Sequence, residues 1–415
     1  MVEFRRYLLT LTTALCGFVL FVASANVFVD PYMLFDVVRL EGFNDIKSRA
    51  GQRGVVVRRQ LISAQRPRAL IVGNSRAEVG FDPRHPSWRS DVKPVVNAAV
   101  PGAGVGVARR MVEHAFAVGR PAVLIVGLDF VDFRVKSDSS DRAEILPRSG
   151  DPPRWDVGLR EYLSAGMTVD ALSDSILTVV SQRNRYSEMV TSDGFNPMLD
   201  YIRIAKTEGY GTLFLQRNRE NARIYYEGPK EVVPVHGRSE AVRNLMALIE
   251  VARSRDTEVH LVIYPYHAHI LELFRMTGLW PAFERWKREL VEVVAAFDVD
   301  SDRPPIRLKL WDFSGYSQYA TEPVPKHGDR KSVVQWYWEA GHFKKELGDV
   351  LLKRVLAGIT QDSTDSFGVV LSRQNIDRHL EEIEAQGRRY RSSQSDEVGR
   401  LTEIVESLRS AKKSQ

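Results

Sequence analysis

Residues 69–78 read Ala69-Leu70-Ile71-Val72-Gly73-Asn74-Ser75-Arg76-Ala77-Glu78, an apolar run that enters a small polar turn. The run from Ala69 to Val72 lies between Pro67 and Gly73, which predicts a strand buried on both faces in a parallel sheet. Ser75 would then lie at the carboxyl edge of the strand, where open α/β sheets bind their ligands. The alternative is that Gly73 and Asn74 only form a turn and that Ser75 caps the next helix.

The alternation of strand and helix continues along the chain. Short apolar runs predict further strands at 94–97, 122–127, 258–264 and 307–313, and amphipathic patterns predict helices at 55–64, 105–118, 238–253, 281–297 and 345–356. This order is typical of an α/β fold with a doubly wound, mostly parallel sheet flanked by helices. Asp129 and His267 follow two of the strands, so we expect them at the same sheet edge as Ser75.

The loop at 98–104 is rich in glycine and precedes a predicted helix. Its glycines at 102, 104 and 106 do not match the dinucleotide fingerprint, because positions 107 and 109 are Val and Arg. We therefore expect no cofactor. The loop instead offers backbone N–H groups that could hold a developing negative charge.

Composition excludes several classes of protein. The 415 residues are 44% hydrophobic and 27% charged, which is ordinary for a globular chain. A net charge of +5 without a basic, aromatic-rich stripe disfavours a nucleic-acid partner. Cys16 is the single cysteine, which excludes an internal disulfide, and the histidines at 267, 269 and 342 lack the spacing of one zinc motif, so no metal is expected.

The segment from Tyr7 to Val29 is uncharged and would span roughly 35 Å as a helix, enough to cross a lipid bilayer. Arg5 and Arg6 before it predict a cytoplasmic amino terminus, a single pass through the inner (plasma) membrane and a periplasmic or extracellular main domain. A cleaved signal peptide is the alternative, since residues 23–25 are Ala-Ser-Ala. The apolar run continues beyond that site, which favours an uncleaved anchor.

Changes in composition predict the domain organisation. We expect a cytoplasmic stub and transmembrane anchor at 1–29, a membrane-proximal connector at 30–65, an α/β domain at 66–358 with an insertion around 136–235, and a tail at 359–415. The tail is polar and charged, with predicted helices at 375–386 and 398–410 but no large apolar stripe. It is therefore expected to be a helical appendage that packs weakly or is partly disordered.

Four short motifs resemble those of the SGNH, or GDSL-like, hydrolase superfamily over roughly residues 66–358. They are Gly73-Asn74-Ser75, the loop from Asn97 to Gly102, Gly127-Leu128-Asp129 and Glu339-Ala340-Gly341-His342. The resemblance implies that Ser75 is a nucleophile, His342 its base, Glu339 the acid that orients His342, and Gly102 a glycine of the oxyanion hole. Asn97, Asp129 and Asn74 are further oxyanion or substrate-binding candidates, and Arg76, Tyr266, His267 and Trp338 are candidate pocket residues.

The implied roles agree with elementary chemistry. A serine hydroxyl is a poor nucleophile until an imidazole takes its proton, and a carboxylate fixes the tautomer of that imidazole. The chain departs from the family at Asp129, where the family has an asparagine that donates to the oxyanion. An ionised carboxylate there would repel the intermediate. Either Asp129 is protonated, or Asn97 or Asn74 substitutes, or the site has drifted.

Within the superfamily, the anchor, the Gly-Asn-Ser-Arg start and the Gly-Leu-Asp-Phe motif resemble proteins associated with O-acetylation of exported polysaccharides. That resemblance implies an exported serine esterase or O-acetyltransferase whose substrate is a polysaccharide or an acylated carbohydrate. A membrane-bound acyltransferase is a candidate partner. The alternatives are a non-catalytic scaffold that binds polysaccharide or such an acyltransferase, and a structural cell-envelope protein whose charged tail is the working part.

Overall fold

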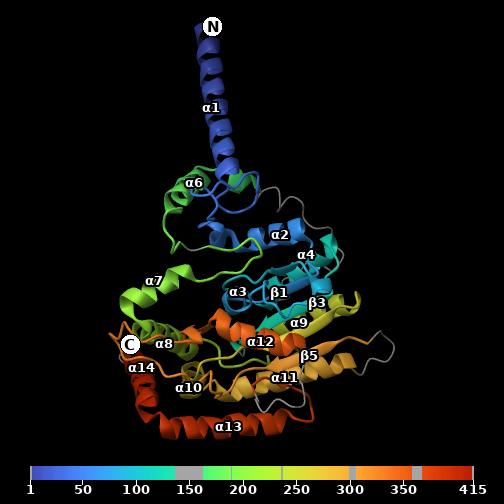
Figure 1. Cartoon of the computed structure of the whole chain (residues 1–415), viewed down its shortest axis with the longest axis vertical. Coiled ribbons are helices and arrows are strands. Elements are labelled where there is room, and N and C mark those ends of the chain that lie inside the picture. The colour runs from blue at the N-terminus through green and yellow to red at the C-terminus, as the bar shows by residue number, and fades with distance from the viewer. Residues whose placement is uncertain are drawn as a thin grey trace. The chain divides into compact units, whose positions relative to one another are not determined.

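A computed structural model describes residues 2–135, 162–187, 189–234, 237–298, 305–357 and 367–413. The chain divides into two compact units (Figure 1). Unit 1 contains Met1–Gln60, Ala143–Thr191 and Asn196–Asp200, and unit 2 contains Leu61–Arg142, Ser192–Phe195 and Tyr201–Gln415. Part of the predicted insertion therefore belongs to the same unit as the predicted anchor and connector.

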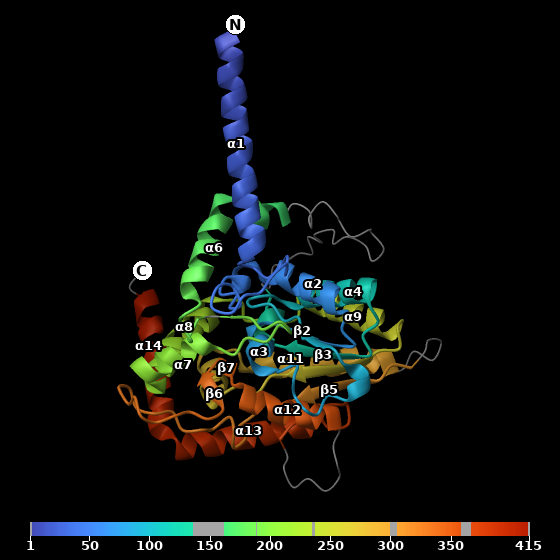
Figure 2. The ribbon, with the colours of Figure 1, turned by 45° about the horizontal axis from the view of Figure 1, so that its top comes forward.

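Helix α1 (Val2–Val29) dominates unit 1 and is long and apolar enough to cross a membrane. Its last turns pack against α6 (Val169–Ser181), which Figure 2 shows beside the end of α1. The carbonyl groups at the end of α1 find partners in the connector, because Asn44 donates to Phe28 O at 3.0 Å and Lys47 Nζ donates to Val29 O at 2.9 Å. These bonds satisfy carbonyls that a helix end leaves unpaired.

Unit 2 is built on a six-stranded sheet in the order β2-β1-β3-β4-β5-β8. The strands are β1 (Ala69–Val72), β2 (Val95–Asn97), β3 (Val123–Leu128), β4 (Glu258–Ile263), β5 (Leu308–Asp312) and β8 (Val369–Val370). The first five are parallel and β8 is antiparallel to β5, which confirms the expected α/β fold with a mostly parallel sheet. All five parallel strands coincide with predicted ones, because most of their side chains are buried and the strands read as largely apolar runs.

The strand order gives a topological switch point at the carboxyl edge of the sheet. From β1 the chain moves to β2 on one side and then to β3 on the other side. The loops that leave β1 and β3 therefore diverge, and open α/β sheets bind ligands at such a switch point. Ser75 follows β1 and Asp129 follows β3, so both residues lie at this point.

Helices flank the sheet (Figure 1). They include α3 (Ser75–Gly80), α4 (Val105–Val118), α8 (Tyr210–Glu227), α9 (Glu240–Arg253), α10 (Ala268–Met276), α11 (Trp280–Asp298) and α12 (Lys345–Ala357), with short 3-10 turns η2 (Ser90–Val92) and η3 (Phe130–Phe133). The predicted helices at 105–118, 238–253, 281–297 and 345–356 are confirmed as α4, α9, α11 and α12. In the chain that joins the two units, η1 (Ala50–Arg53) is followed by α2 (Gly54–Gln65), predicted at 55–64, and α7 (Leu199–Glu208) precedes α8.

The described part of the carboxyl-terminal tail packs more extensively than its polar composition predicts. It contains β8, α13 (Ile376–Ser393) and α14 (Ser395–Lys413). Helix α13 contacts α11, and α14 contacts α8 and α10. Leu380, Ile383 and Tyr390 are buried although most of their neighbours are charged, because a narrow apolar stripe is enough when the opposite face is solvated.

Candidate active site

The turn after β1 places Ser75 at the start of a helix. The Asn74 side chain accepts a hydrogen bond from Arg76 N at 3.1 Å, so Asn74 is the cap of α3 and Ser75 is its first residue. Gly73 has a φ of +151°, and a Cβ there would collide with the Tyr264 hydroxyl. Only glycine suits this position. The alternative in which Ser75 is the cap is therefore wrong.

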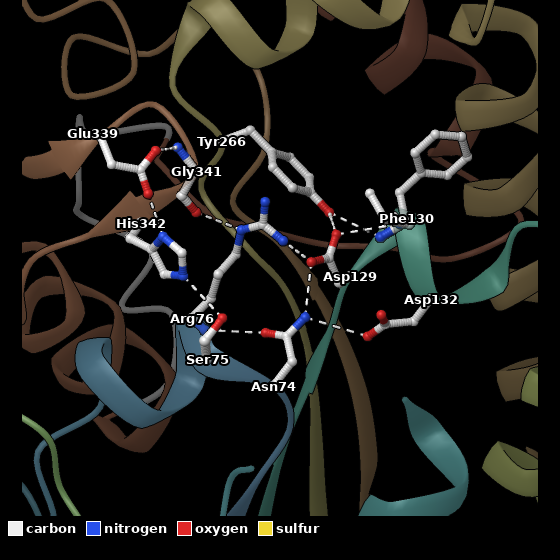
Figure 3. A network of polar contacts seen from close by, with 11 residues as sticks. Asn74, Ser75, Arg76, Asp129, Phe130, Asp132, Tyr266, Glu339, Gly341 and His342 are labelled. Atoms are coloured by element: carbon white, nitrogen blue, oxygen red, sulfur yellow. Dashed lines mark hydrogen bonds and ion pairs between the residues drawn. The ribbon is translucent and has the colours of Figure 1, made fainter. Parts of the chain in front are cut away.

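Ser75, His342 and Glu339 form one hydrogen-bonded relay (Figure 3). His342 Nε2 lies 2.8 Å from Ser75 Oγ, and His342 Nδ1 faces Glu339 Oε1. The antiparallel strands β6 (Tyr337–Glu339) and β7 (His342–Phe343) bring the acid and the imidazole to the same end of a hairpin. In the turn between β6 and β7, Gly341 N donates to the second carboxylate oxygen of Glu339 at 2.7 Å, which fixes the orientation of the acid.

Burial and charge suit the relay to proton transfer. The Glu339 side chain is 1% exposed and that of His342 is 24% exposed, so the acid is sealed while the imidazole remains accessible. Burial alone would raise the pKa of Glu339, but the charge and hydrogen bond of His342 and the Gly341 N–H outweigh it and lower that pKa below its usual value. Glu339 is therefore ionised at neutral pH and can hold the His342 tautomer that accepts from Ser75.

Arg76 lies at the centre of the polar network in Figure 3. Its Nε donates to Gly341 O at 2.5 Å, its Nη1 forms an ion pair with Asp129, and its guanidinium lies 5.3 Å from the centroid of the Tyr266 ring. One side chain thus joins the hairpin that carries His342 to the end of β3. Arg76 is 9% exposed, so its charge and that of Asp129 neutralise each other in a largely buried position.

Both oxygens of Asp129 accept hydrogen bonds. Oδ2 accepts from Asn74 Nδ2 at 2.8 Å as well as from Arg76, and Oδ1 accepts from the Tyr266 hydroxyl at 3.0 Å and from Val131 N at 3.3 Å. A carboxylate surrounded by donors needs no proton of its own. The charge of Asp129 is directed at Arg76, and protonation is not required to neutralise it.

Asp132 extends the network and was not a candidate from the sequence. Asn74 Nδ2 also donates to its Oδ2 at 3.3 Å. Burial raises the pKa of Asp132 to about 6, although Arg76 and the Asn74 hydrogen bond act in the opposite direction. Its spacing of three residues from Asp129 across the turn η3 is the signal that could have identified it.

The expected asparagine donors to an oxyanion are engaged elsewhere. The Asn97 side chain donates to Ala77 O at 2.8 Å and to Phe81 O at 2.9 Å, so it stabilises the end of α3. Asn74 donates to Asp129 and Asp132. Gly102 is exposed and has a φ of +69°, in a loop that Val100 N ties to Gly73 O at 3.0 Å.

The other candidate pocket residues divide into two groups. Tyr266 belongs to the network, since its hydroxyl donates to Asp129 and accepts from Phe130 N at 2.9 Å. His267 is buried against Phe214, and its Nε2 faces Glu322 O at 3.1 Å. Burial is the main cause that lowers the pKa of His267, and the charge of nearby His269 adds to it. The Trp338 ring contacts Tyr201 and Lys344. Among the described residues, these contacts of His267 and Trp338 lie outside the network around Arg76.

A cavity of about 500 Å³ lies outside this network, at the end of β5 beside α13, and Ser314, His379 and Gln386 are among the residues that line it. Within the described ranges, no group of three or more His, Cys, Asp or Glu side chains is arranged to hold a metal ion. The chain matches no model of a known protein family and no curated protein.

Proposed function

We propose that this chain is a membrane-anchored serine esterase or O-acetyltransferase of the SGNH type that acts on an exported polysaccharide. The observation that carries the proposal is the relay in which Ser75 Oγ lies 2.8 Å from His342 Nε2 while His342 Nδ1 faces the buried Glu339. The relay lies at the switch point of the sheet, which is where such folds bind ligands.

The chemistry that follows from this geometry is acyl transfer in two steps. His342 Nε2 takes the proton of Ser75 Oγ as that oxygen attacks the ester carbonyl, and the same proton is passed to the leaving alcohol when the tetrahedral intermediate collapses. The acyl group is then bound to Ser75. His342 next deprotonates either water, which gives an esterase, or a sugar hydroxyl, which gives a transferase.

Backbone N–H groups are the best candidates to hold the oxyanion. Asn74 and Asn97 are engaged in other hydrogen bonds, whereas the first N–H of a helix, here that of Ser75, has no carbonyl partner within its own helix. The loop with Gly102 is tied to the turn that carries Ser75 and could supply a second N–H. Arg76 balances the charge of Asp129, which removes the repulsion expected from an isolated carboxylate.

The location and the substrate class rest on different observations. Helix α1 supports a single-pass anchor, and Arg5 and Arg6 favour an amino terminus in the cytoplasm with the catalytic domain in the periplasm or outside the cell. The polysaccharide substrate and a membrane-bound acyltransferase as partner rest on the resemblance of the anchor, the Gly-Asn-Ser-Arg start and the Gly-Leu-Asp-Phe motif to proteins associated with O-acetylation of exported polysaccharides.

The proposal is tested by release of p-nitrophenol from its acetate ester, using the full chain in detergent. Ser75→Ala and His342→Ala should each lower the rate by about a thousandfold or more, because the relay acts as a unit. Ser254→Ala and His327→Ala, at exposed positions elsewhere in unit 2, are matched controls and should retain the rate of the unaltered chain. Transfer is then distinguished from hydrolysis by supplying an acceptor sugar and measuring its acetylation.

A non-catalytic scaffold is the second candidate, and one observation favours it. The side-chain amide that would assist an oxyanion is absent at Asp129, and those of Asn74 and Asn97 are engaged. Equal rates for Ser75→Ala, His342→Ala and the unaltered chain would support this candidate, and retention on a polysaccharide column by all three would then identify the scaffold's ligand.

A further inference from the structure

Helix α6 carries an exposed apolar face that the site does not use. Val169, Ile176 and Val180 are 62%, 58% and 71% exposed, and Leu177 is 41% exposed. At 100° per residue these positions fall within one side of the helix, together with Ser173. Leu163 and Met167, just before α6, are each 47% exposed. Isolated apolar residues on a surface are ordinary, but a continuous group of this kind indicates an interaction site.

The opposite face of α6 is small and polar and packs on α1. Ala171, Ser175 and Thr178 are buried there, spaced as i, i+4 and i+7. Asn26 of α1 makes three hydrogen bonds at this seam: its amide donates to Gly166 O at 3.0 Å and to Thr168 O at 3.1 Å, and it accepts from Ser175 Oγ at 2.9 Å. The seam fixes α6 to α1, so the exposed face of α6 has a defined depth along α1.

That depth follows from the length of α1. The hydrocarbon core of a bilayer is spanned by about 20 helical residues, roughly 30 Å. Counted from Tyr7, the first residue after Arg6, this span ends at Asn26. The residues that bind Asn26 would then lie at the boundary between acyl chains and headgroups. The start of α6 would lie at the same level, and the helix runs from there to Ser181 and Gln182, which bind Ser48 and Ile46 of the connector.

We infer that α6 is a second membrane contact, a helix whose apolar face (Leu163, Met167, Val169, Ile176, Leu177 and Val180) enters the bilayer interface beside α1. The inference rests on α1 crossing the membrane, which belongs to the proposed anchor, and is independent of the chemistry at Ser75. The occupant is lipid because α6 packs on the membrane-spanning helix and begins at the depth where that helix would leave the hydrocarbon core. The two acidic residues of α6, Asp170 and Asp174, lie off the centre of the apolar face, and Asp174 binds Tyr32 at 2.6 Å.

The consequence is a defined anchor rather than a free tether. A single helix rotates and tilts easily, whereas two elements joined by a buried seam hold unit 1 in one orientation on the membrane. An interfacial helix needs no hydrogen-bond partners in lipid, because its backbone groups are satisfied within the helix.

The test uses a fluorophore whose emission depends on its environment, attached to one cysteine at a time in the full chain reconstituted into phosphatidylcholine vesicles. The native Cys16 reports on α1, and Val180→Cys or Ser173→Cys in a Cys16→Ser background reports on α6. Glu227→Cys in the same background, at an exposed position of unit 2, is the control. Vesicles made with lipids brominated on the acyl chains should remove most of the emission at positions 16, 173 and 180 and leave position 227 unchanged. Ser173→Cys removes no apolar side chain, so it guards against an effect of Val180→Cys on folding.

Two results would overturn the inference. If the label at 16 is quenched while those at 173 and 180 behave like the label at 227, the anchor stands and α6 lies outside the membrane. If the labels on α6 are blue-shifted but not quenched by brominated lipid, a protein surface such as a second copy covers the face instead. Loss of quenching at 16 as well would refute the anchor itself, whatever the esterase assay shows.

Discussion

Arg76 links the start of α3, at Ser75, to the hairpin that carries His342. It is the covalent neighbour of Ser75, and its side chain binds the carbonyl of Gly341, the residue before His342. The guanidinium is planar and presents several donors in a fixed geometry, which allows it to bind Gly341 and Asp129 at once. Arg76 is therefore a positioning residue for the relay.

We predict that Arg76→Lys lowers kcat for ester hydrolysis by about 10- to 100-fold with little change in KM, because the ammonium cannot hold both partners and the relay shifts. Arg89→Lys, at an exposed arginine paired with Asp91, is the control and should behave like the unaltered chain. Steady-state kinetics on both variants measure the difference. A folded Arg76→Lys variant with unchanged kcat would show that the hairpin is positioned by its own strand pairing.

Asp132 makes the stability of unit 2 depend on pH. Its pKa is raised to about 6 in the folded protein from the ordinary value of 3.8, so the folded state binds a proton that the unfolded state releases between these values. Ionisation of Asp132 therefore lowers the free energy of unfolding above pH 6, and this penalty disappears below about pH 4. We predict that Asp132→Asn raises the free energy of unfolding at pH 8 by on the order of 1 to 3 kcal/mol and has no effect near pH 3.5.

Urea unfolding of Asp132→Asn and of the unaltered chain across that pH range measures the effect. The asparagine still accepts from Asn74, so the hydrogen bond is retained. A gain in stability that is the same at all pH values would mean that ionisation of Asp132 is not its origin.

The roles of Ser75, Glu339 and His342 could be proposed from the sequence because each chemistry-bearing residue stands next to a recognisable strand or motif. The positioning role of Arg76 could not be proposed from the sequence, because its partner Gly341 lies 265 positions further along the chain and the contact exists only after folding. Asn97 illustrates the opposite error. An asparagine at a strand end suggests a ligand donor, but its amide is used to hold the end of α3.

Helix α3 begins at Ser75 and is held by close backbone contacts with β7 and α12. A methyl group on Gly348 in α12 would overlap the carbonyl oxygen of Gly80, and one on Gly80 would overlap the Phe343 ring. These two glycines let the segment with Ser75 approach the strand with His342. A backbone atom cannot move aside as the end of a flexible side chain can, so added volume must separate the elements.

We predict that Gly348→Ala destabilises unit 2 by about 1 to 3 kcal/mol and lowers esterase activity as α12 moves away from α3. Gly399→Ala is the matched control: this glycine is also helical, in α14, and a Cβ there meets no atom within 4 Å. It should gain up to about 1 kcal/mol from helix propensity alone. Thermal unfolding compares the two variants. If Gly348→Ala stabilises the protein as Gly399→Ala does, the contact between α12 and Gly80 relaxes freely.

Strands and helices differ in how well the sequence predicts them. Most residues of the five parallel strands are buried, so the strands read as largely apolar runs. The hairpin of β6 and β7 pairs only a few residues across a turn, and its identity depends on tertiary contacts of Tyr337 and Phe343 rather than on pattern. The apolar pattern does not identify the second half of α8, because its buried positions, such as Asn218 and Ala222, are not strongly apolar.

The carboxyl-terminal segment is part of the folded body of unit 2. Its β8 extends the sheet at β5, and His269 of α10 binds Glu397 of α14 at 2.7 Å. Composition predicted weak packing of this segment because mean hydropathy is averaged over all faces of a helix. Burial involves only one apolar stripe of the helix and a few polar pairs whose charges neutralise each other. Lys287, Asp312 and His379 form such a cluster across α11, β5 and α13.

The cluster around Asp312 should govern the acid stability of unit 2. Asp312 and Lys287 are completely buried and 2.8 Å apart, and Lys287 Nζ also donates to Ser314 Oγ at 2.7 Å. Burial alone would raise the pKa of Asp312, but Lys287 and His379 outweigh it and hold that pKa far below its usual range. Since the folded pKa is depressed, the stabilisation from Asp312 is fully present above about pH 4 and is lost as the pH falls below that value.

We predict that Asp312→Asn lowers the free energy of unfolding by about 3 to 5 kcal/mol at pH 7, because Lys287 is left buried without its counter-charge. The deficit should shrink below pH 4, where the unaltered chain begins to lose the same interaction. Glu292→Gln is the control, since Glu292 joins α11 to Arg373 of the same segment through an ion pair that is 58% and 53% exposed, and it should change little at any pH because solvent screens it. Denaturant unfolding from pH 3 to pH 8 measures all three chains. If Asp312→Asn and Glu292→Gln behave alike, the carboxyl-terminal segment is held by its apolar stripe, and the buried charges contribute nothing to its attachment.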